Sequence, residues 1–233
     1  MNLLSITERL KNPKVSKLEK LVRIEFIDVV KNLNINKVLS ISCGDGTWEY
    51  LVFHHAKSIK EIIATDIVEC PVSKSDQLLL KDLGNWSFTK VDASGILPFE
   101  DNHFDFVFHQ DVVEHTDKPY TFLKEQYRVL RGGGTLLCGT PNLFRPANII
   151  KLITGHLRFP VKIGYNKQIG DYIHVQEFYE QQLKLILAEI GFKDIQVKHC
   201  FFGFHFANIC FSMYPTSDLG KTLSHFLVFT AKK

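Results

Sequence analysis

The sequence has few cysteines, and none of them belongs to a paired motif. Their number is odd, and no two have the spacing of a CxxC metal or redox pair; they are Cys43, Cys70, Cys138, Cys200 and Cys210. Unpaired thiols are typical of a reducing compartment. We therefore expect a cytoplasmic protein with no bound metal.

Long hydrophobic runs are also missing. The longest apolar stretch, Phe201 to Tyr214, is interrupted by His205 and Asn208 and is shorter than the ~20 residues that a spanning helix needs. Residues 1–20 alternate charged and apolar side chains without a continuous hydrophobic segment. We expect neither a signal peptide nor a transmembrane segment.

The chain has no large excess of charge of either sign. Its net charge of +3 is far from the basic footprint of a nucleic-acid-binding protein, so no nucleic-acid partner is expected. The 233 residues contain 45% hydrophobic and 23% charged side chains, and no internal repeat is visible. These values indicate one globular domain spanning residues 1–233.

The segment at residues 37–47, KVLSISCGDGT, joins an apolar strand to a turn of small residues. Gly44 and Gly46 permit tight backbone angles and a close approach of a ligand to the backbone. A second strand then ends on the carboxylate of Asp66, which suits the hydroxyls of a ribose. Because Thr47 and Trp48 follow where a dehydrogenase would have a third glycine, nicotinamide binding is disfavoured.

Five features follow one another in order along the chain. They are VLSISCGDG at 38–46, Asp66, VDASGILPF at 91–99, FDFVFHQDVVEH at 104–115 and YRVLRGGGTLL at 127–137. In this order they resemble the class I S-adenosylmethionine-dependent methyltransferases, in the branch called methyltransferase type 11. The resemblance covers about two-thirds of the chain and implies S-adenosyl-L-methionine as the cofactor.

The resemblance implies a set of cofactor-binding residues. Asp92 would accept a hydrogen bond from the adenine amino group, the backbone of Ala93 would contact the ring, and His109 would either frame the pocket or pack beneath it. The full set is Ser42, Cys43, Gly44, Gly46, Asp66, Ile67, Asp92, Ala93 and His109.

Two positions depart from the pattern of this family. Ser40 stands where an acidic residue is usual, and Ser42 where a first glycine is usual. Either a neighbouring carboxylate, Asp45 or Glu49, compensates for Ser40, or cofactor affinity is reduced. A non-catalytic cofactor-binding partner subunit is therefore one alternative to an enzyme.

Two histidines are candidates for the proton acceptor, because a neutral imidazole suits that task near neutral pH. His174, at the exit of residues 143–173, is the first candidate, and His115 is the second. The segment 143–173 is interpreted as an insertion that covers the acceptor site, and residues 1–35 as an N-terminal helical cap. The acidic and histidine residues at 111–115 have a capping role as their alternative interpretation.

The hydrophobic periodicity predicts an α/β protein with a doubly wound, mostly parallel sheet. The resemblance implies seven strands in a Rossmann-like class I methyltransferase fold with an antiparallel C-terminal strand. Strands are expected near 37–42, 61–66, 86–91, 103–109, 133–139, 193–200 and 223–231. Helices are expected near 15–33, 47–56, 74–83, 119–130 and 176–190.

The acceptor is expected to be a small molecule, methylated at an oxygen of a sugar, glycan precursor or related metabolite. Residues 140–142 lack the aromatic residue that stacks a flipped base, so base methylation is not expected. The phenylalanines between 201 and 211 are interpreted as core. Their alternative is a lining for a lipophilic acceptor, such as a quinone precursor, or a membrane contact. A homodimer is left open.

Overall fold

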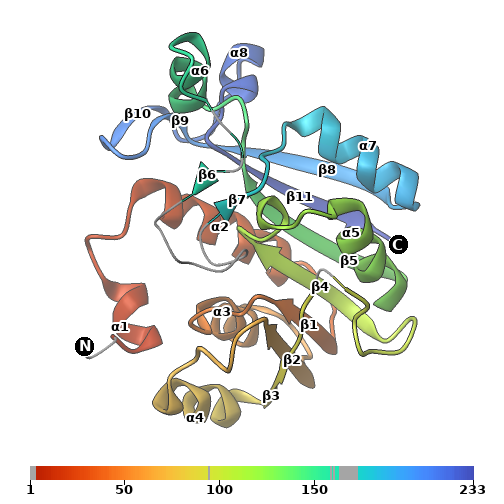
Figure 1. Ribbon diagram of the computed structural model, residues 1–233. Helices are drawn as coiled ribbons and strands as arrows, with labels where there is room; N and C mark the ends of the chain where they lie inside the picture. Colours follow the sequence, from red (N-terminus) through yellow and green to blue (C-terminus); the bar gives the residue numbers. More distant parts are fainter. Residues whose placement is uncertain (1–3, 94, 158, 160, 163–172) are drawn as a thin grey trace.

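The fold is built on one twisted sheet of seven strands. The computed structural model describes all residues except 1–3, 94, 158, 160 and 163–172. The strands of the sheet are β1 (Lys37–Ile41), β2 (Glu61–Asp66), β3 (Asn85–Lys90), β4 (Phe104–Gln110), β5 (Leu130–Pro141), β8 (Lys193–Cys200) and β11 (Phe226–Lys232). They lie in the order β3-β2-β1-β4-β5-β11-β8 (Figure 1). Strands β1 to β5 are parallel, and β11 runs antiparallel to both of its neighbours. The predicted fold class is thus confirmed.

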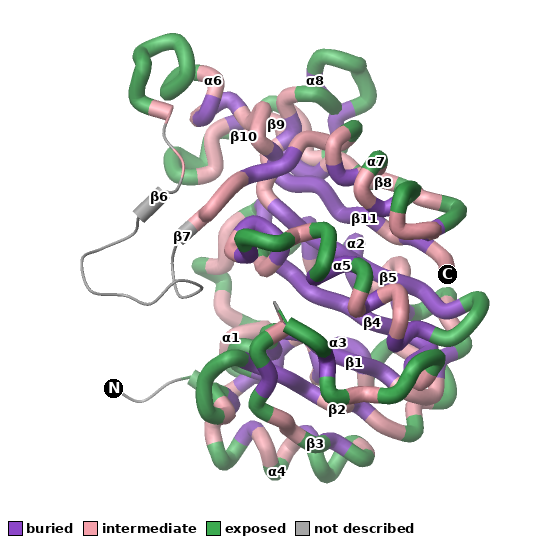
Figure 2. Tube along the Cα trace, turned by 45° about the vertical axis from the view of Figure 1, so that its right-hand side comes forward, coloured by how far each residue is buried: buried purple, intermediate pink, exposed green. Residues whose placement is uncertain are grey.

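Helices cover both faces of this sheet, as a doubly wound fold requires. One face is covered by α2 (Lys17–Lys31), α3 (Thr47–His55) and α4 (Lys74–Leu83), and the other by α5 (Pro119–Val129) and α7 (Glu180–Ile190). Figure 2 shows the buried strands running between these more exposed layers.

Successive side chains along each strand point to opposite faces of the sheet and so contribute to two hydrophobic cores, one on each face. Val38 and Phe106 face α2, where the ring of Phe26 lies 6.5 Å from that of Phe106, whereas Leu39 and Val107 face α5 and α7. Because both faces of β1 and β4 are buried, each of these strands is a nearly continuous run of apolar residues in the sequence.

The remaining elements gather at the carboxyl ends of the parallel strands. They are α1 (Ile6–Lys11), the short 3₁₀ helix η1 (Val113–His115), α6 (Pro146–Ile153), β6 (Val161–Lys162), β7 (Ile173–His174), β9 (Phe202–Phe204), β10 (Ile209–Ser212) and α8 (Asp218–Thr222). In open α/β sheets, ligands bind at this edge. Of the predicted insertion 143–173, residues 158, 160 and 163–172 lie outside the described residues, so its role as a cover stays a prediction.

Two details differ from the sequence expectations. The helix expected from residue 176 begins at Glu180, because Phe178 is still extended and forms a bridge with Asn142. The phenylalanine set divides: Phe201 is 1% exposed, but Phe206 is 79% and Phe211 is 61% exposed, so the core interpretation is wrong for these two. These two side chains belong to the β9–β10 hairpin and lie outside the core, whereas Cys210 of the same hairpin packs against it. Within the described residues, every helix is too short or too polar to cross a lipid bilayer.

Candidate active site

The turn after β1 has the backbone form expected of a cofactor cradle. Gly44 and Gly46 have φ of 52° and 80°, and Ser42, with φ of 59°, is also left-handed. A Cβ on Gly46 would lie 3.1 Å from Leu80, whereas one on Gly44 would meet nothing within 4 Å. The backbone at Gly44 therefore borders open space, and a ligand can approach it closely.

Asp66 connects this turn to the end of β2. Its Oδ2 accepts a hydrogen bond from the Gly44 amide at 3.3 Å, and its Oδ1 accepts one from the Val68 amide at 3.4 Å. The Cys43 amide also donates to the Thr65 carbonyl at 2.8 Å. The carboxylate is thus oriented by the same turn that it borders.

A cavity of about 290 Å³ opens beside this carboxylate. Most of its lining comes from the ends of the first three strands and from the segment after β4; the predicted residues among the lining are Ser42, Asp66, Ile67, Asp92, Ala93 and His115. The backbone-contact residues Cys43, Gly44 and Gly46 form the turn behind Ser42. The fold therefore brings together predicted residues from three separate strand ends.

His109 lies outside this lining. It is fully buried with its ring 5.0 Å from that of Phe122, and burial lowers its pKa to about 3. Neither ring nitrogen has a hydrogen bond from the described residues. The side chain is consequently a neutral packing group, and a cofactor contact of its own remains a prediction.

A buried carboxyl group lies beside Ser40, the position that departs from the usual pattern. Glu49, in the first turn of α3, is fully buried, and burial raises its pKa to about 7, although the Ser40 hydroxyl lowers it in part. The two side chains do not reach hydrogen-bond geometry, and no described residue bonds either Glu49 oxygen. The other candidate, Asp45, is paired with Arg9 Nε at 2.9 Å. An orphaned acid under the turn, the glycine backbone and the Asp66 carboxylate together fit an adenosyl cofactor with an amino-acid tail.

His174, the first candidate for the proton acceptor, is oriented by a carboxylate. Its Nδ1 lies 2.8 Å from Glu177 Oε1, and Glu177 also receives Arg145 Nη2 at 2.6 Å and Asn148 Nδ2 at 2.7 Å. Burial alone would raise the pKa of Glu177, but the hydrogen bonds from His174, Arg145 and Asn148 lower it to about 2. Glu177 is therefore ionised and accepts from Nδ1–H, so the neutral form of His174 has its lone pair on Nε2.

Arg145 was not among the predicted site residues. It follows β5 within residues 143–150, a stretch whose only other polar residue is Asn148. A charged residue at the carboxyl end of a central strand is the signal that would have found it. It is the N-cap residue of α6 and contacts Glu177 across a separation of 32 residues.

His115 and His174, the two candidates for the proton acceptor, lie next to each other. Their ring centroids are 4.9 Å apart and nearly perpendicular. The amide of Val175 donates to the Glu114 carbonyl at 2.9 Å, which holds β7 against η1. Because His115 also lines the cofactor cavity, the pair stands at its edge.

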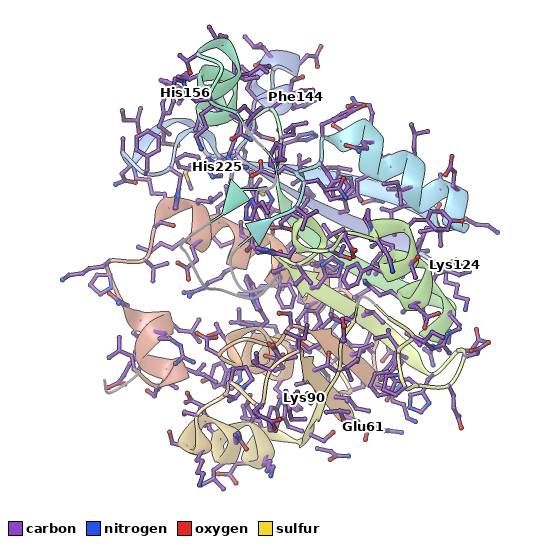
Figure 3. The ribbon with its side chains drawn as sticks, in the orientation of Figure 1. Glu61, Lys90, Lys124, Phe144, His156 and His225 are labelled. Carbon is purple, nitrogen blue, oxygen red and sulfur yellow. The ribbon has the colours of Figure 1, made fainter. Side chains whose placement is uncertain are left out.

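A second cavity, of about 350 Å³, opens on the α2 side of the sheet end. It is lined by Ser16, Leu18, Glu19, Val22, Asp111, Pro141, His205, His225 and Phe226. Figure 3 labels His225, whose pKa is lowered to about 3 by burial and by the charge of Arg145.

Comparison with known proteins agrees with this geometry. A family model described as "Methyltransferase domain" matches residues 39–138. The demethylmenaquinone methyltransferase of Staphylococcus saprophyticus is 31% identical over 181 residues, which are 73% of this chain and 77% of that protein. The enzyme of the same name from Geobacillus kaustophilus is 27% identical over 191 residues, 76% of this chain and 80% of that protein.

Solved structures share the fold. A SAM-dependent methyltransferase from Thermotoga maritima has a TM-score of 0.60 at 19% identity and covers 93% of this chain and 91% of its own. Another from Archaeoglobus fulgidus has a TM-score of 0.60 at 18% identity, with 97% of each chain covered. The strand order, the cradle after β1 and the similarity to these proteins lead to one conclusion: the chain belongs to the class I S-adenosylmethionine-dependent methyltransferases of the type 11 family, and it is an enzyme that uses this cofactor.

Proposed function

We propose that this enzyme methylates a hydroxyl oxygen of a small molecule, such as a sugar or glycan precursor, bound between the cofactor cavity and His174. The observation that carries the proposal is the His174–Glu177 pair. An imidazole whose Nδ1 proton is held by an ionised carboxylate has its other nitrogen ready to accept a proton.

The cofactor supplies a methyl group on a positively charged sulfur. The chain would align the acceptor with that methyl group and exclude water, and orientation alone is worth effective molarities of ~10⁵ to 10⁸ M. His174 Nε2 would take the hydroxyl proton, and Glu177 would stabilise the imidazolium that forms. Arg145 keeps Glu177 ionised for this role.

An acceptor screen tests this function. The full-length protein is incubated with donor and a panel of sugar nucleotides, other hydroxylated metabolites and phenols, with formation of S-adenosylhomocysteine as readout. For any active compound, the analogue lacking the reacting hydroxyl should give no turnover above the acceptor-free rate. Equal turnover of the analogue would reject oxygen as the methylated atom.

A lipophilic acceptor is the second candidate, and one surface favours it. Phe206, Phe211 and Ile209 of the β9–β10 hairpin are exposed, as is Ile153 of α6, which packs near β9. The relatives named above carry the name demethylmenaquinone methyltransferase, which is that of an enzyme with a quinone-type acceptor. An exposed apolar surface next to an acceptor site suits a substrate with a hydrocarbon tail.

Substitutions in the hairpin distinguish the two candidates. Phe206→Ser and Phe211→Ser remove exposed rings whose ring-to-ring contacts, among the described residues, are only with other rings of the hairpin, so we expect a loss of stability of no more than about 1.5 kcal/mol each. For a quinone precursor with an isoprenoid tail, the KM should rise while the KM for a tail-less analogue stays unchanged. If both KM values stay at the wild-type level, the hairpin takes no part in binding, and the hydrophilic acceptor is favoured.

A further inference from the structure

Three potential metal ligands converge at the edge of the cofactor cavity. Glu114, His115 and His174 each offer one ligand atom, and these atoms all lie within 4.8 Å of one another. Two come from η1 and one from β7, which is about sixty residues further along the chain, so the fold brings them together rather than a local motif.

Glu114 has an oxygen with no partner among the described residues. Its side chain is fully buried; Thr140 Oγ1 donates to Oε2 at 3.0 Å, but Oε1 accepts no hydrogen bond from the part of the chain that the structure describes. An unbalanced buried carboxylate is costly, and a bound cation removes that cost.

The surroundings of His174 are those of a metal-binding histidine. Ligating histidines generally donate their second ring N–H to a carboxylate or carbonyl, which fixes the ring and the tautomer. His174 Nδ1 has this partner in Glu177 at 2.8 Å, and Arg145 and Asn148 hold Glu177 in place. The Nε2 lone pair is thereby the one available to an ion.

We propose that Glu114, His115 and His174 bind a divalent cation of the Zn²⁺ class, with open coordination positions toward the acceptor. Zn²⁺ takes nitrogen and oxygen ligands at about 2.0 to 2.2 Å, which requires the ligand atoms to lie roughly 3 to 4 Å apart. The separations of up to 4.8 Å need side-chain movements of about 1 Å or less to close on an ion. Two imidazoles disfavour Mg²⁺ and Ca²⁺, which prefer oxygen ligands. This differs from the expectation of no metal that the cysteine spacing gave.

The site itself does not depend on the proposed function, but its use in catalysis does. A cation at the edge of the cavity would lower the pKa of an acceptor hydroxyl, so that the proton leaves to water before the oxygen attacks the methyl carbon and the sulfur–carbon bond breaks. His174 would then have one role in each state of the protein: in the metal-free protein it accepts the proton, as the proposed function has it, and in the metal-bound protein it is a ligand.

Binding of Zn²⁺ alone tests the site without any acceptor. Chelator-treated, reduced full-length protein is titrated with Zn²⁺ by calorimetry, and bound metal is counted by elemental analysis. We expect one ion per chain. Glu114→Gln, His115→Ala and His174→Ala should each weaken binding by more than about 100-fold, and Glu177→Gln by about 10- to 100-fold. The control His55→Ala, an exposed histidine at the end of α3, should bind as wild type does.

Two further measurements exclude binding at a cysteine and loss of binding through unfolding. Co²⁺ substituted at this site should lack the thiolate charge-transfer absorption that a cysteine ligand would give. Thermal unfolding of the nearly isosteric Glu114→Gln variant verifies that it is folded. Absence of stoichiometric binding, or equal binding by the three ligand variants and wild type, would overturn the proposal. Failure to methylate any hydroxylated acceptor, with the ion bound as expected, would instead count against the proposed function.

Discussion

At the scale of single residues, Asp66 connects the turn after β1 with the lining of the cavity. It accepts one hydrogen bond from Gly44 of this turn and one from Val68, and it also lines the cavity. The sequence could place this carboxylate at the end of the second strand, because such a strand end has a purely local signature, whereas its contact with the ribose stays a prediction. The position of the turn after β1, in contrast, depends on the hydrogen bond from the Cys43 amide to the Thr65 carbonyl, which forms only when β1 and β2 lie side by side in the sheet.

Replacing Asp66 by Ala should weaken cofactor binding strongly. Hydrogen bonds to a charged group contribute about 1.5 to 3 kcal/mol each, and the variant would lose those to the ribose and loosen the turn at Gly44. Calorimetric titration with S-adenosylhomocysteine should show a dissociation constant at least about 10-fold higher. Asp82→Asn, at an exposed position of α4, is the matched control. An unchanged affinity of Asp66→Ala would remove the ribose assignment.

Glu49 should make stability depend on pH in an unusual direction. Its pKa is about 7 in the folded protein and 4.5 ordinarily, so between these values only the unfolded state releases the proton. The protonated Glu49 carboxyl therefore makes its full contribution to the free energy of unfolding below pH 4.5, and this contribution is lost as the pH rises through about 7. The shift corresponds to at most about 3 kcal/mol.

Urea unfolding of wild type and Glu49→Gln at several pH values isolates this effect. The unfolding free energy of the wild type, relative to that of the variant, should fall steadily between pH 4.5 and 7. A constant difference would mean that Glu49 is ionised throughout in the folded protein.

Among the elements, α1 is held to the cofactor turn by one arginine. Arg9 Nη2 donates to the Asp45 carbonyl at 2.9 Å and lies 3.5 Å from Asp76, which is buried and also accepts from the Ile6 amide at 3.1 Å. The sequence pattern did not separate this helix from α2, and one N-terminal helix was expected. Six residues are too few for periodicity to be recognised.

Arg9→Ala should destabilise the protein by about 1 to 3 kcal/mol, because it leaves the buried Asp76 carboxylate without its cation. Lys31→Ala, which removes an exposed pair with Asp28, should cost no more than about 0.5 kcal/mol. Chemical unfolding measures both variants. Equal and small effects would show that α1 is not anchored through Arg9.

The long elements could be predicted from sequence, and the short ones could not. Strands β1, β2 and β4 and helices α3, α4 and α5 have strong apolar patterns and fall within a few residues of their predicted bounds. The β9–β10 hairpin was missed because phenylalanines suit both a core and an exposed strand, and packing alone decides between them. The convergence of Glu114, His174 and Arg145 depends on β7 lying across η1, which no local pattern encodes.

At the scale of the whole molecule, the continuous sheet should make unfolding a single event. Both tryptophans, Trp48 and Trp86, report on the core under α2 and α3, whereas far-ultraviolet circular dichroism reports on all helices. The two signals should follow one transition, and S-adenosylhomocysteine at 100 times its dissociation constant should stabilise the protein by about 2.7 kcal/mol.

Two separate transitions would instead indicate that the two helical layers unfold independently.

The oligomeric state, for which the sequence left a homodimer open, stays a prediction that sedimentation velocity can check. The exposed apolar side chains of α6 and β10 are the surface on which such a dimer would depend.

The most direct test of the account is the turnover of His174→Ala with its true acceptor. In the proposed function this residue takes the acceptor proton at the edge of the cavity, so methyl transfer at saturating cofactor should fall by about 100-fold or more. The affinity for S-adenosylhomocysteine should stay near the wild-type value, and His55→Ala should be fully active. Near-normal turnover of His174→Ala would contradict the account, because the acceptor proton would then leave without the group that the fold places there.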